Sequence, residues 1–428
     1  MKLLLTTLAA FCLCFSATTT PLIESSDSDW PQWRGPERNG TSNETGLLKQ
    51  WPAGGPKLLW QVNDIGDGYS TPVVVGSRIY LMSNRGMDNE YVQALSTQDG
   101  KVIWTTRVGN VGNPNQNPPY PKARSTPTFD GNFLYALGSD GDLACLEAKS
   151  GKIRWSKNLR SEFGGKPGEW AYAESPLVDG DAVVVTPGGA QATMVALNKK
   201  TGAVIWKSAI PGGDEAGYAS AIVVHAAGRK QYVQFLSKGI VGVDAKTGQF
   251  LWRYDEAAKG PAQYFTPVAR GEFVYGGALS VGGGMVRLKP NGNGVEAEQV
   301  YFIRGLPNGP GGAVVVGDHL YGTEVGQKLV AAEFTTGKVK WETADFGRAS
   351  IAAADGHLYL HRTDGDLLLV EATPDGYREK GRFAPPAQPQ GKRMGQFTDN
   401  ALAYPVIANG TLYIRDLGTI WAWDIKAR

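Results

Sequence analysis

The sequence repeats one short unit along most of its length. In residues 125–155, four short runs of apolar and β-branched residues are separated by Asp-Gly or Ser-Gly pairs, which favour tight hairpin turns. Further copies occupy residues 70–104, 174–206, 219–252, 266–301, 312–341, 350–383 and 404–425. The aromatic residues that close the copies are Trp104, Trp155, Trp206, Trp252, Tyr301, Trp341 and Phe383. A four-stranded repeat of about 40–50 residues predicts a β-propeller, because one twisted sheet cannot bury both faces alone.

The two ends of the repeat region complement each other. The last copy, residues 404–425, stops before its final strand. Residues 57–62 form a lone closing strand, with Trp60 where the other copies carry their Trp. Pairing these two ends would close the ring and leave no sheet edge exposed. We therefore predict an all-β fold over residues 57–428: an eight-bladed β-propeller of four-stranded antiparallel blades, closed by the N-terminal strand.

The chain opens with a targeting segment. A charged start, a short apolar core and then small residues predict a cleaved secretory signal peptide over residues 1–20. This segment places the mature protein in the periplasm or outside the cell. Cys12 and Cys14 suggest a lipid anchor, but Phe11 and Leu13 suit the position before a lipidated cysteine poorly. We therefore expect no anchor.

Residues 21–56 form an N-terminal extension that contains the motif Asp-Trp-Pro-Gln-Trp-Arg-Gly-Pro. Two Trp residues and an Arg among turn-forming residues are not the composition of a disordered linker. We expect this extension to drape over the propeller and bury Trp30 and Trp33. The alternative is that it serves as a docking motif for another protein.

Composition excludes several classes of partner. The net charge is +2 and no basic run occurs, which argues against a nucleic-acid partner. No segment after the leader reaches the 18 apolar residues that would span a bilayer. Cys145 is the one cysteine left after the leader, so we expect no disulfide within the chain and a buried, inert thiol. We expect a monomer.

The segment that closes each copy resembles a repeat of a known family. It stands at residues 146–155, 196–206 and 243–252 as an apolar strand, a Thr-Gly or Ser-Gly turn and a Trp. These segments resemble the tryptophan-docking repeats of the pyrroloquinoline-quinone-type propellers, and the resemblance covers residues 57–428. The opening of the extension resembles a secreted subgroup of such proteins. The resemblance implies that one Trp per blade docks between neighbouring blades: Trp60, Trp104, Trp155, Trp206, Trp252 and Trp341.

This superfamily contains eight-bladed quinoprotein alcohol dehydrogenases and a non-enzymatic scaffold lipoprotein of outer-membrane assembly. The fold therefore does not decide the function. In the dehydrogenases, pyrroloquinoline quinone (PQQ) stacks on a Trp beneath adjacent cysteines, and carboxylate and amide groups hold a Ca²⁺. The present chain has no adjacent cysteine pair, and its insertions between blades are short. PQQ with Ca²⁺ is therefore the alternative, and no cofactor is the main expectation.

A hydrolase or metal enzyme is a third hypothesis. The chain has four histidines but no HExxH motif, Cys/His cluster or Gly-x-Ser-x-Gly elbow. His357 and His361 flank a predicted strand segment, which places them about 13 Å apart, too far to share one metal ion. We assign no catalytic or metal-ligating residue.

One position varies between copies, while the Gly turn and the Trp after it hardly vary. The residue just before the first strand of each blade is expected at the inner, funnel-facing end of that blade. These residues are Tyr69, Arg124, Ala173, Tyr218, Tyr264, Pro310, Arg348 and Leu402, with Trp170, Tyr172 and Glu174 beside the third. Tyr and Arg are enriched in binding sites. We predict a funnel ring that binds a ligand or partner: Tyr69, Arg124, Glu174, Tyr218, Tyr264 and Arg348. The alternative is that the Tyr residues cap the blade ends.

The sequence thus favours a non-catalytic binding or scaffold propeller of the bacterial cell envelope, which holds an envelope protein or a small ligand at its funnel. The alternative function is a PQQ-dependent dehydrogenase that oxidises an alcohol or a sugar.

Overall fold

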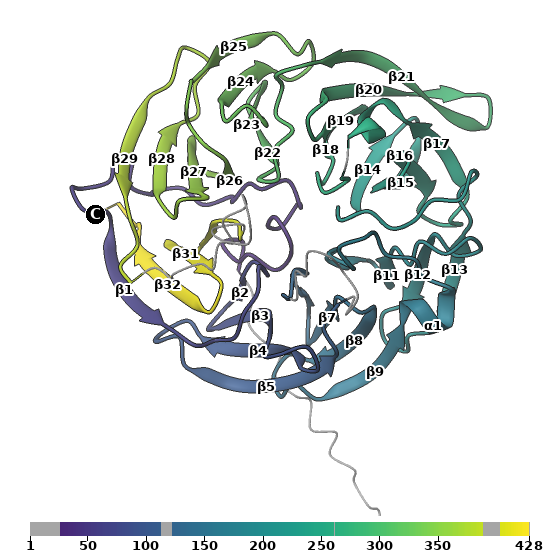
Figure 1. Ribbon diagram of the computed structural model, residues 1–428, viewed down its shortest axis with the longest axis horizontal. Helices are drawn as coiled ribbons and strands as arrows, with labels where there is room; N and C mark the ends of the chain where they lie inside the picture. The colour runs from purple at the N-terminus through teal and green to yellow at the C-terminus, as the bar shows by residue number, and fades with distance from the viewer. Residues whose placement is uncertain (1–25, 113–121, 261, 388–402, 428) are drawn as a thin grey trace, which may run out of the picture.

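The computed structural model describes residues 26–112, 122–260, 262–387 and 403–427. These residues form eight four-stranded sheets arranged as a closed ring (Figure 1). We call the space that the innermost strands enclose the central channel. Within each sheet the strands pair antiparallel with their neighbours, so the prediction of an all-β, eight-bladed propeller is confirmed. The predicted signal peptide, residues 1–20, lies outside the described residues.

Each blade begins with a short strand beside the channel and ends with a strand at the rim (Figure 1). Blade 1 holds β2 (Val73–Val75), β3 (Arg78–Asn84), β4 (Glu90–Ser96) and β5 (Val102–Gly109). Blade 2 holds β6 (Thr128–Asp130), β7 (Phe133–Leu137), β8 (Asp142–Glu147) and β9 (Ile153–Asn158). Blade 3 holds β10 (Leu177–Asp179), β11 (Ala182–Val185), β12 (Met194–Asn198) and β13 (Val204–Ser208). Blade 4 holds β14 (Ile222–Ala226), β15 (Arg229–Leu236), β16 (Gly239–Asp244) and β17 (Phe250–Tyr254).

The remaining blades follow the same order. Blade 5 holds β18 (Val268–Arg270), β19 (Phe273–Ala278), β20 (Gly282–Asn291) and β21 (Gly294–Ile303). Blade 6 holds β22 (Ala313–Val316), β23 (His319–Thr323), β24 (Leu329–Glu333) and β25 (Val339–Glu342). Blade 7 holds β26 (Ala349–Ala354), β27 (His357–Arg362), β28 (Leu367–Glu371) and β29 (Glu379–Phe383). Blade 8 holds β30 (Val406–Ala408), β31 (Thr411–Asp416), β32 (Thr419–Asp424) and β1 (Lys57–Val62).

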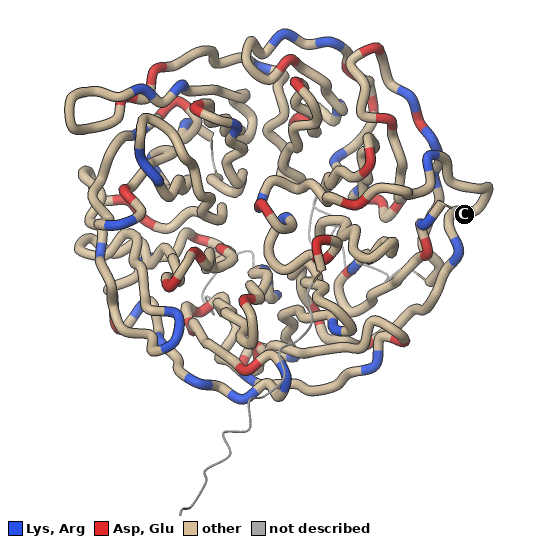
Figure 2. The backbone as a smooth tube through the Cα atoms, turned by 180° about the vertical axis from the view of Figure 1, so that it is seen from behind, with Lys and Arg blue, Asp and Glu red and all other residues tan. Residues whose placement is uncertain are grey.

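In the part of the chain that the structure describes, two short helices lie in connections between blades: α1 (Leu159–Phe163) and the 3-10 helix η1 (Glu256–Lys259). No helix among the described residues is long and apolar enough to cross a membrane. Lys, Arg, Asp and Glu are interspersed around the outer rim of the ring (Figure 2).

The ring closes as the sequence predicts. Strand β1 pairs antiparallel with β32 from Lys57 opposite Asp424 to Val62 opposite Ile420. It therefore supplies the rim strand of the last blade, as β5 does for the first blade. Strand β32 carries two fully buried indoles, Trp421 and Trp423, so closure protects a dense part of the core.

The blade-closing Trp residues lie against the next blade. In five blades the indole N–H donates to a carbonyl of the turn between the third and fourth strands of the next blade, at 2.8–3.2 Å. The donor–acceptor pairs are Trp60–Thr97, Trp104–Ala148, Trp155–Lys199, Trp206–Ala245 and Trp341–Thr373. In the first four of these turns a glycine packs on the ring; at Gly202, with φ of 71°, a Cβ atom would lie 3.0 Å from Trp155. The repeat therefore needs both the Gly and the Trp.

Trp252 departs from this pattern. Its indole N–H donates to Oε1 of Gln231 in its own blade, at 2.7 Å. In the following blade, β20 and β21 each have ten residues, and their hairpin extends past the rim (Figure 1). The turn between β20 and β21, which would offer a carbonyl to Trp252, therefore lies too far out to accept from its indole.

We expect Trp155→Ala to lower the free energy of unfolding by about 3 kcal/mol, since large-to-small changes at packed aromatic residues cost this much. Trp155→Phe keeps an aromatic ring but loses the bond to Lys199, and should cost about 1 kcal/mol. Urea denaturation of the two variants measures the difference. Wild-type stability of Trp155→Ala would show that the Trp is not a docking residue.

Candidate functional site

The N-terminal extension enters the central channel. Trp30 exchanges two backbone hydrogen bonds with Val74 of β2, at 2.8 and 2.9 Å, and the Pro31 carbonyl accepts from Phe129 of β6. On either side of Thr41, Ala353 of β26 donates its N–H to the Gly40 carbonyl and accepts from the Ser42 N–H, both at 2.8 Å. Strands β2, β6 and β26 are innermost strands, so the extension lies inside the ring (Figure 1). Trp30 is buried as predicted, but the extension fills part of the channel rather than lying across a face.

We call residues 26–48 the plug. One end of the channel carries the turns between the first and second strands of the blades, and we call this end the turn face. The plug both enters and leaves the channel at the turn face. Near its start, Asp29 accepts from the Gly76 backbone and from Asn409, and near its end Leu47 donates to Asp355. The tip of the plug therefore points toward the opposite end of the channel, where the first strands begin. We call that end the mouth.

Three side chains at the tip of the plug reach across the channel. The Trp33 indole donates to Thr266 at 3.1 Å, Arg34 donates to the carbonyl of Ala313, and Arg38 donates to the carbonyl of Ser175 at 2.9 Å. Both guanidinium groups are almost fully buried. Burial lowers the pKa of Arg34 and lowers that of Arg38 to about 10. A guanidinium group keeps its charge at neutral pH. The plug thus closes the floor of the mouth with two positive charges.

The structure places the predicted funnel ring at this mouth and brings its members together in groups. Trp170 packs on Tyr218 with ring centroids 5.3 Å apart and donates its backbone N–H to the Tyr218 hydroxyl. Arg124 interacts electrostatically with this same Tyr218. The Lys122 ammonium lies 5.4 Å from the centroid of the Tyr69 ring.

A second group lies at the entries of blades 5, 7 and 8, beside Tyr218 of the first group, whose backbone N–H donates to the Gln263 carbonyl. The Tyr264 hydroxyl donates to the Asn308 carbonyl at 3.1 Å, and its ring interacts electrostatically with Arg348 and Tyr404. Burial raises the pKa of Tyr264, so its hydroxyl keeps its proton. The side chains of the five Tyr and Arg members of the ring are half-buried.

Glu174 differs from the rest of the ring. Its carboxylate is almost fully buried and accepts from Thr186, through both the backbone N–H and the hydroxyl, and from the Gln234 amide. Burial raises the pKa of Glu174 to about 7, against the lowering effects of these bonds and of Arg38. Glu174 therefore lies below the mouth and links blade 3 electrostatically to the plug.

Glu90 is a second buried acid near the mouth. One carboxylate oxygen accepts from the backbone N–H and the hydroxyl of Ser139, at 2.9 and 2.7 Å, while Oε1 has no partner among the described residues. Burial raises the pKa of Glu90 to about 7, although Ser139 and Arg124 act to lower it. The folded protein thus holds the proton of Glu90 more tightly than the unfolded chain does.

This shift predicts a pH-dependent loss of stability. The contribution of neutral Glu90 is complete below the ordinary pKa of 4.5 and is lost as the pH rises to about 7. Glu90→Gln keeps the neutral form at every pH, so it should match wild type at pH 4 and exceed it by about 1–3 kcal/mol at pH 8. Urea denaturation at the two pH values tests this, and an equal difference at both would contradict it.

The residues at the mouth do not fit a Ca²⁺–quinone site. The one carboxylate of the predicted ring, Glu174, already has its oxygens engaged by Thr186 and Gln234. In the described part of the chain, no three His, Cys, Asp or Glu side chains are grouped as a metal ion would require. Cys145 is buried, as predicted, and burial raises the pKa of its thiol to about 12. We derive no reaction step through a quinone or a metal.

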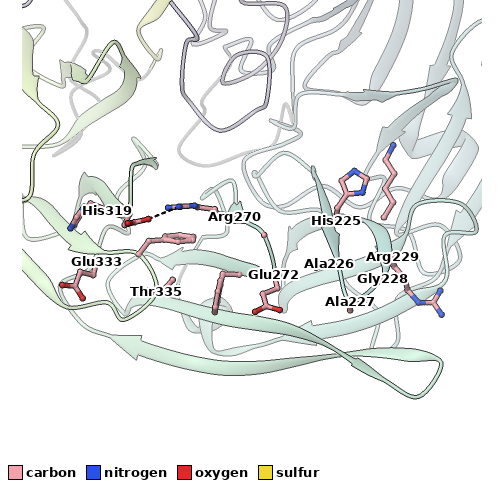
Figure 3. A pocket seen from close by; sticks show the side chains of 15 residues that line it. His225, Ala226, Ala227, Gly228, Arg229, Arg270, Glu272, His319, Glu333 and Thr335 are labelled. Carbon is pink, nitrogen blue, oxygen red and sulfur yellow. Dashed lines mark ion pairs between the residues drawn. The ribbon is translucent and has the colours of Figure 1, made fainter.

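A hollow in the described surface lies at the opposite end of the channel. It has a volume of about 1130 Å³ and opens on the turn face between blades 4, 5 and 6 (Figure 3). Its lining includes His225, Arg229, Arg270, Glu272, His319 and Glu333. The sequence did not predict this hollow, because its lining comes from turns of three separate blades.

The two arginines of the plug were also missed. Their signal is the Trp-Arg-Gly-Pro-Glu-Arg run at residues 33–38, in which cations stand among turn residues of a secreted segment. Arg34 also stacks over Tyr404, 5.6 Å from its ring centroid. The sequence does not reveal that these cations become buried, because their partners lie in blades 3, 6 and 8.

Sequence comparisons agree with the repeat assignment. The family model described as outer membrane protein assembly factor BamB matches residues 88–275. BamB of Yersinia pestis is 25% identical over 239 residues, which cover 52% of this chain and 55% of that protein. The tetrathionate hydrolase of Acidithiobacillus ferrooxidans is 24% identical over 257 residues, which cover 52% of this chain and 48% of that protein. The matches therefore span about half the length of these relatives.

Solved structures extend the likeness of fold to most of the chain. BamB from Moraxella catarrhalis superposes with a TM-score of 0.59 at 17% identity, covering 89% of this chain and 99% of that one. A quinohemoprotein alcohol dehydrogenase from Pseudomonas putida HK5 superposes with a TM-score of 0.53 at 13% identity, covering 94% and 81%. The chain is thus an eight-bladed β-propeller with pyrroloquinoline-quinone-like repeats, similar to BamB in sequence over residues 88–275 and in fold over most of its length.

Proposed function

We propose that this protein is a non-catalytic binding or scaffold propeller of the bacterial cell envelope, which holds an envelope protein or a small ligand at its mouth. The observation that carries the proposal is the floor of the mouth. Trp33, Arg34 and Arg38 bond to three different blades there, and we call this floor together with the funnel ring the dish. Such a dish offers a contact surface without a grouped set of catalytic side chains.

The chemistry of the dish supports binding to polar or anionic groups. Arg124 and Arg348 present planar donors that match a carboxylate or a backbone carbonyl. Tyr69, Tyr218 and Tyr264 offer flat apolar area with a polar tip, at a low cost in side-chain entropy. The positive floor formed by Arg34 and Arg38 adds to the same preference. We infer that Glu174, which is buried, acts by supporting Arg38 rather than by touching a ligand.

The similarity to BamB supports a place in the cell envelope, together with the signal peptide predicted for residues 1–20. The similarity and the signal peptide concern the location of the protein and its class of function. The partner itself can be identified by direct capture.

The test is capture of a partner from an envelope extract by the full chain. We expect the double variant Arg124→Ala/Arg348→Ala to capture at least about tenfold less partner than wild type, while its melting temperature stays at the wild-type value. The control is Arg154→Ala/Arg378→Ala, which removes two half-exposed arginines at the outer strands of blades 2 and 7. Equal capture by the ring variant and the control would reject the mouth as the binding surface.

A further inference from the structure

The plug covers only half of the channel wall. In every blade the comparable residue is the one before the last residue of the innermost strand. In blades 7, 8, 1 and 2 these residues are buried: Ala353, Ile407, Val74 and Phe129. In blades 3, 4, 5 and 6 they stay half-buried or exposed: Val178, His225, Ala269 and Val315. The second set, with strands β10, β14, β18 and β22, defines what we call the open half of the channel.

The plug also shows how the channel wall binds a chain. Val74 and Phe129 each come one residue before the residue that flanks the hairpin turn. Because hydrogen-bonded and non-hydrogen-bonded pairs alternate along an antiparallel ladder, the N–H and C=O groups of Val74 and Phe129 point away from their own blade and into the channel. There they pair with Trp30 and Pro31 of the plug. An innermost strand of this propeller therefore accepts an extended segment through main-chain hydrogen bonds, as in strand addition to a sheet edge.

The open half presents the same backbone groups. Val178, His225, Ala269 and Val315 occupy the same register before their hairpins, opposite Val183, Lys230, Val274 and Leu320. Their N–H and C=O groups must point into the channel by the same alternation. Among the described residues, no backbone hydrogen bond from another segment reaches these four. Here the plug contributes side chains instead, through Trp33, Arg34 and Arg38 near the mouth.

The open half leads to the hollow on the turn face. His225 and Arg270 belong to innermost strands and also line the hollow of about 1130 Å³ (Figure 3). The charged residues at this end are already paired: Arg270 with Asp318, and Lys230 with Asp179. A segment entering here thus meets no uncompensated charge, and the residues further in are the small apolar Val178, Ala269 and Val315.

We propose that the open half of the channel is a second binding site, which takes a short extended polypeptide segment with small apolar side chains. The segment enters from the turn face and pairs its main chain with an innermost strand of blades 3–6. Strands β10 and β18 have three residues each, so the paired stretch is short. This inference rests on the proposed binding function but uses residues distinct from those of the mouth.

The test uses a fluorescein-labelled hexapeptide of alternating Val and Thr as the probe, titrated by fluorescence anisotropy against the full chain. A matched peptide carries N-methyl groups on alternate amides and so cannot donate along one edge. We expect wild type to bind the first peptide, and Ala269→Trp, which adds an indole at a half-buried position of the innermost strand β18, to bind it at least about tenfold more weakly. The control Val204→Trp, on the exposed rim strand β13, should bind like wild type.

Hydrogen exchange adds a readout at the site: the peptide should slow exchange of the His225 and Ala269 amides. The ring variant Arg124→Ala/Arg348→Ala should bind the peptide like wild type, so failure of the mouth and failure of this site are told apart. The assignment is overturned if wild type does not bind the first peptide or binds the N-methylated peptide equally well. It is also overturned if a folded Ala269→Trp variant binds with wild-type affinity, or if the ring variant loses peptide binding.

Discussion

A chain that begins after Val62 is expected to fail to fold into a closed ring. It lacks β1, so the edge of β32 loses its partner from Lys57 to Val62. The indole of Trp60, which donates to Thr97 of blade 1, is lost as well. Blade 8 then neither completes its sheet nor docks on blade 1. An open propeller presents an unpaired, apolar sheet edge, which promotes aggregation.

The comparison that isolates closure is a chain beginning at Lys57. This chain keeps β1 but lacks the plug, so it should still unfold cooperatively, at a lower temperature than a chain beginning at Ser26. The chain beginning after Val62 should show no cooperative transition and should elute as aggregates in size-exclusion chromatography. Equal melting of the two shorter chains would contradict closure by β1.

The second large effect is expected from Trp30→Ala. Trp30 is almost fully buried, and it shares a hydrophobic cluster with Leu47 and Trp51 of the extension and with residues of blades 7, 8 and 1. Removing a buried indole costs about 3–5 kcal/mol. Loss of this anchor should also release the plug, because the backbone pairing of Trp30 with Val74 depends on the indole staying in place.

Two variants control for this effect. Trp30→Phe should cost much less, because the Trp30 indole N–H has no hydrogen-bond partner among the described residues. Trp33→Ala should also cost less, since its side chain is half-buried. Urea denaturation gives the free energies, and limited proteolysis within residues 26–48 reports release of the plug. Wild-type protease resistance in Trp30→Ala would show that the plug is held by other contacts.

Much of the fold follows from the sequence because its signals are local. The Asp-Gly and Ser-Gly pairs determine hairpins within a few residues, as the β6–β7 turn shows, where Gly131 takes a φ of 62°. The once-per-copy Trp and the unmatched strand at residues 57–62 then predict the number of blades and the closure. Each of these inferences needs only neighbouring residues or the comparison of copies.

The contacts of Trp252 show where such reasoning ends. The repeat predicts that it docks like the other Trp residues, yet the ten-residue strands of the next blade remove its acceptor and Gln231 takes over. The same holds for Glu174, which lies at a ring position in the sequence but is buried against Thr186 and Gln234. A copy-by-copy alignment cannot reveal the depth of a side chain, because neighbouring blades decide it.

The sequence by itself determined the strands, the turns, the eight blades and the strand that closes them, because these depend on local turn chemistry and on repetition. The tertiary structure alone decided where the extension goes and which half of the channel it leaves open. Those features depend on backbone pairs such as Trp30 with Val74 and Thr41 with Ala353, which join segments far apart in the chain and have no local sequence signal.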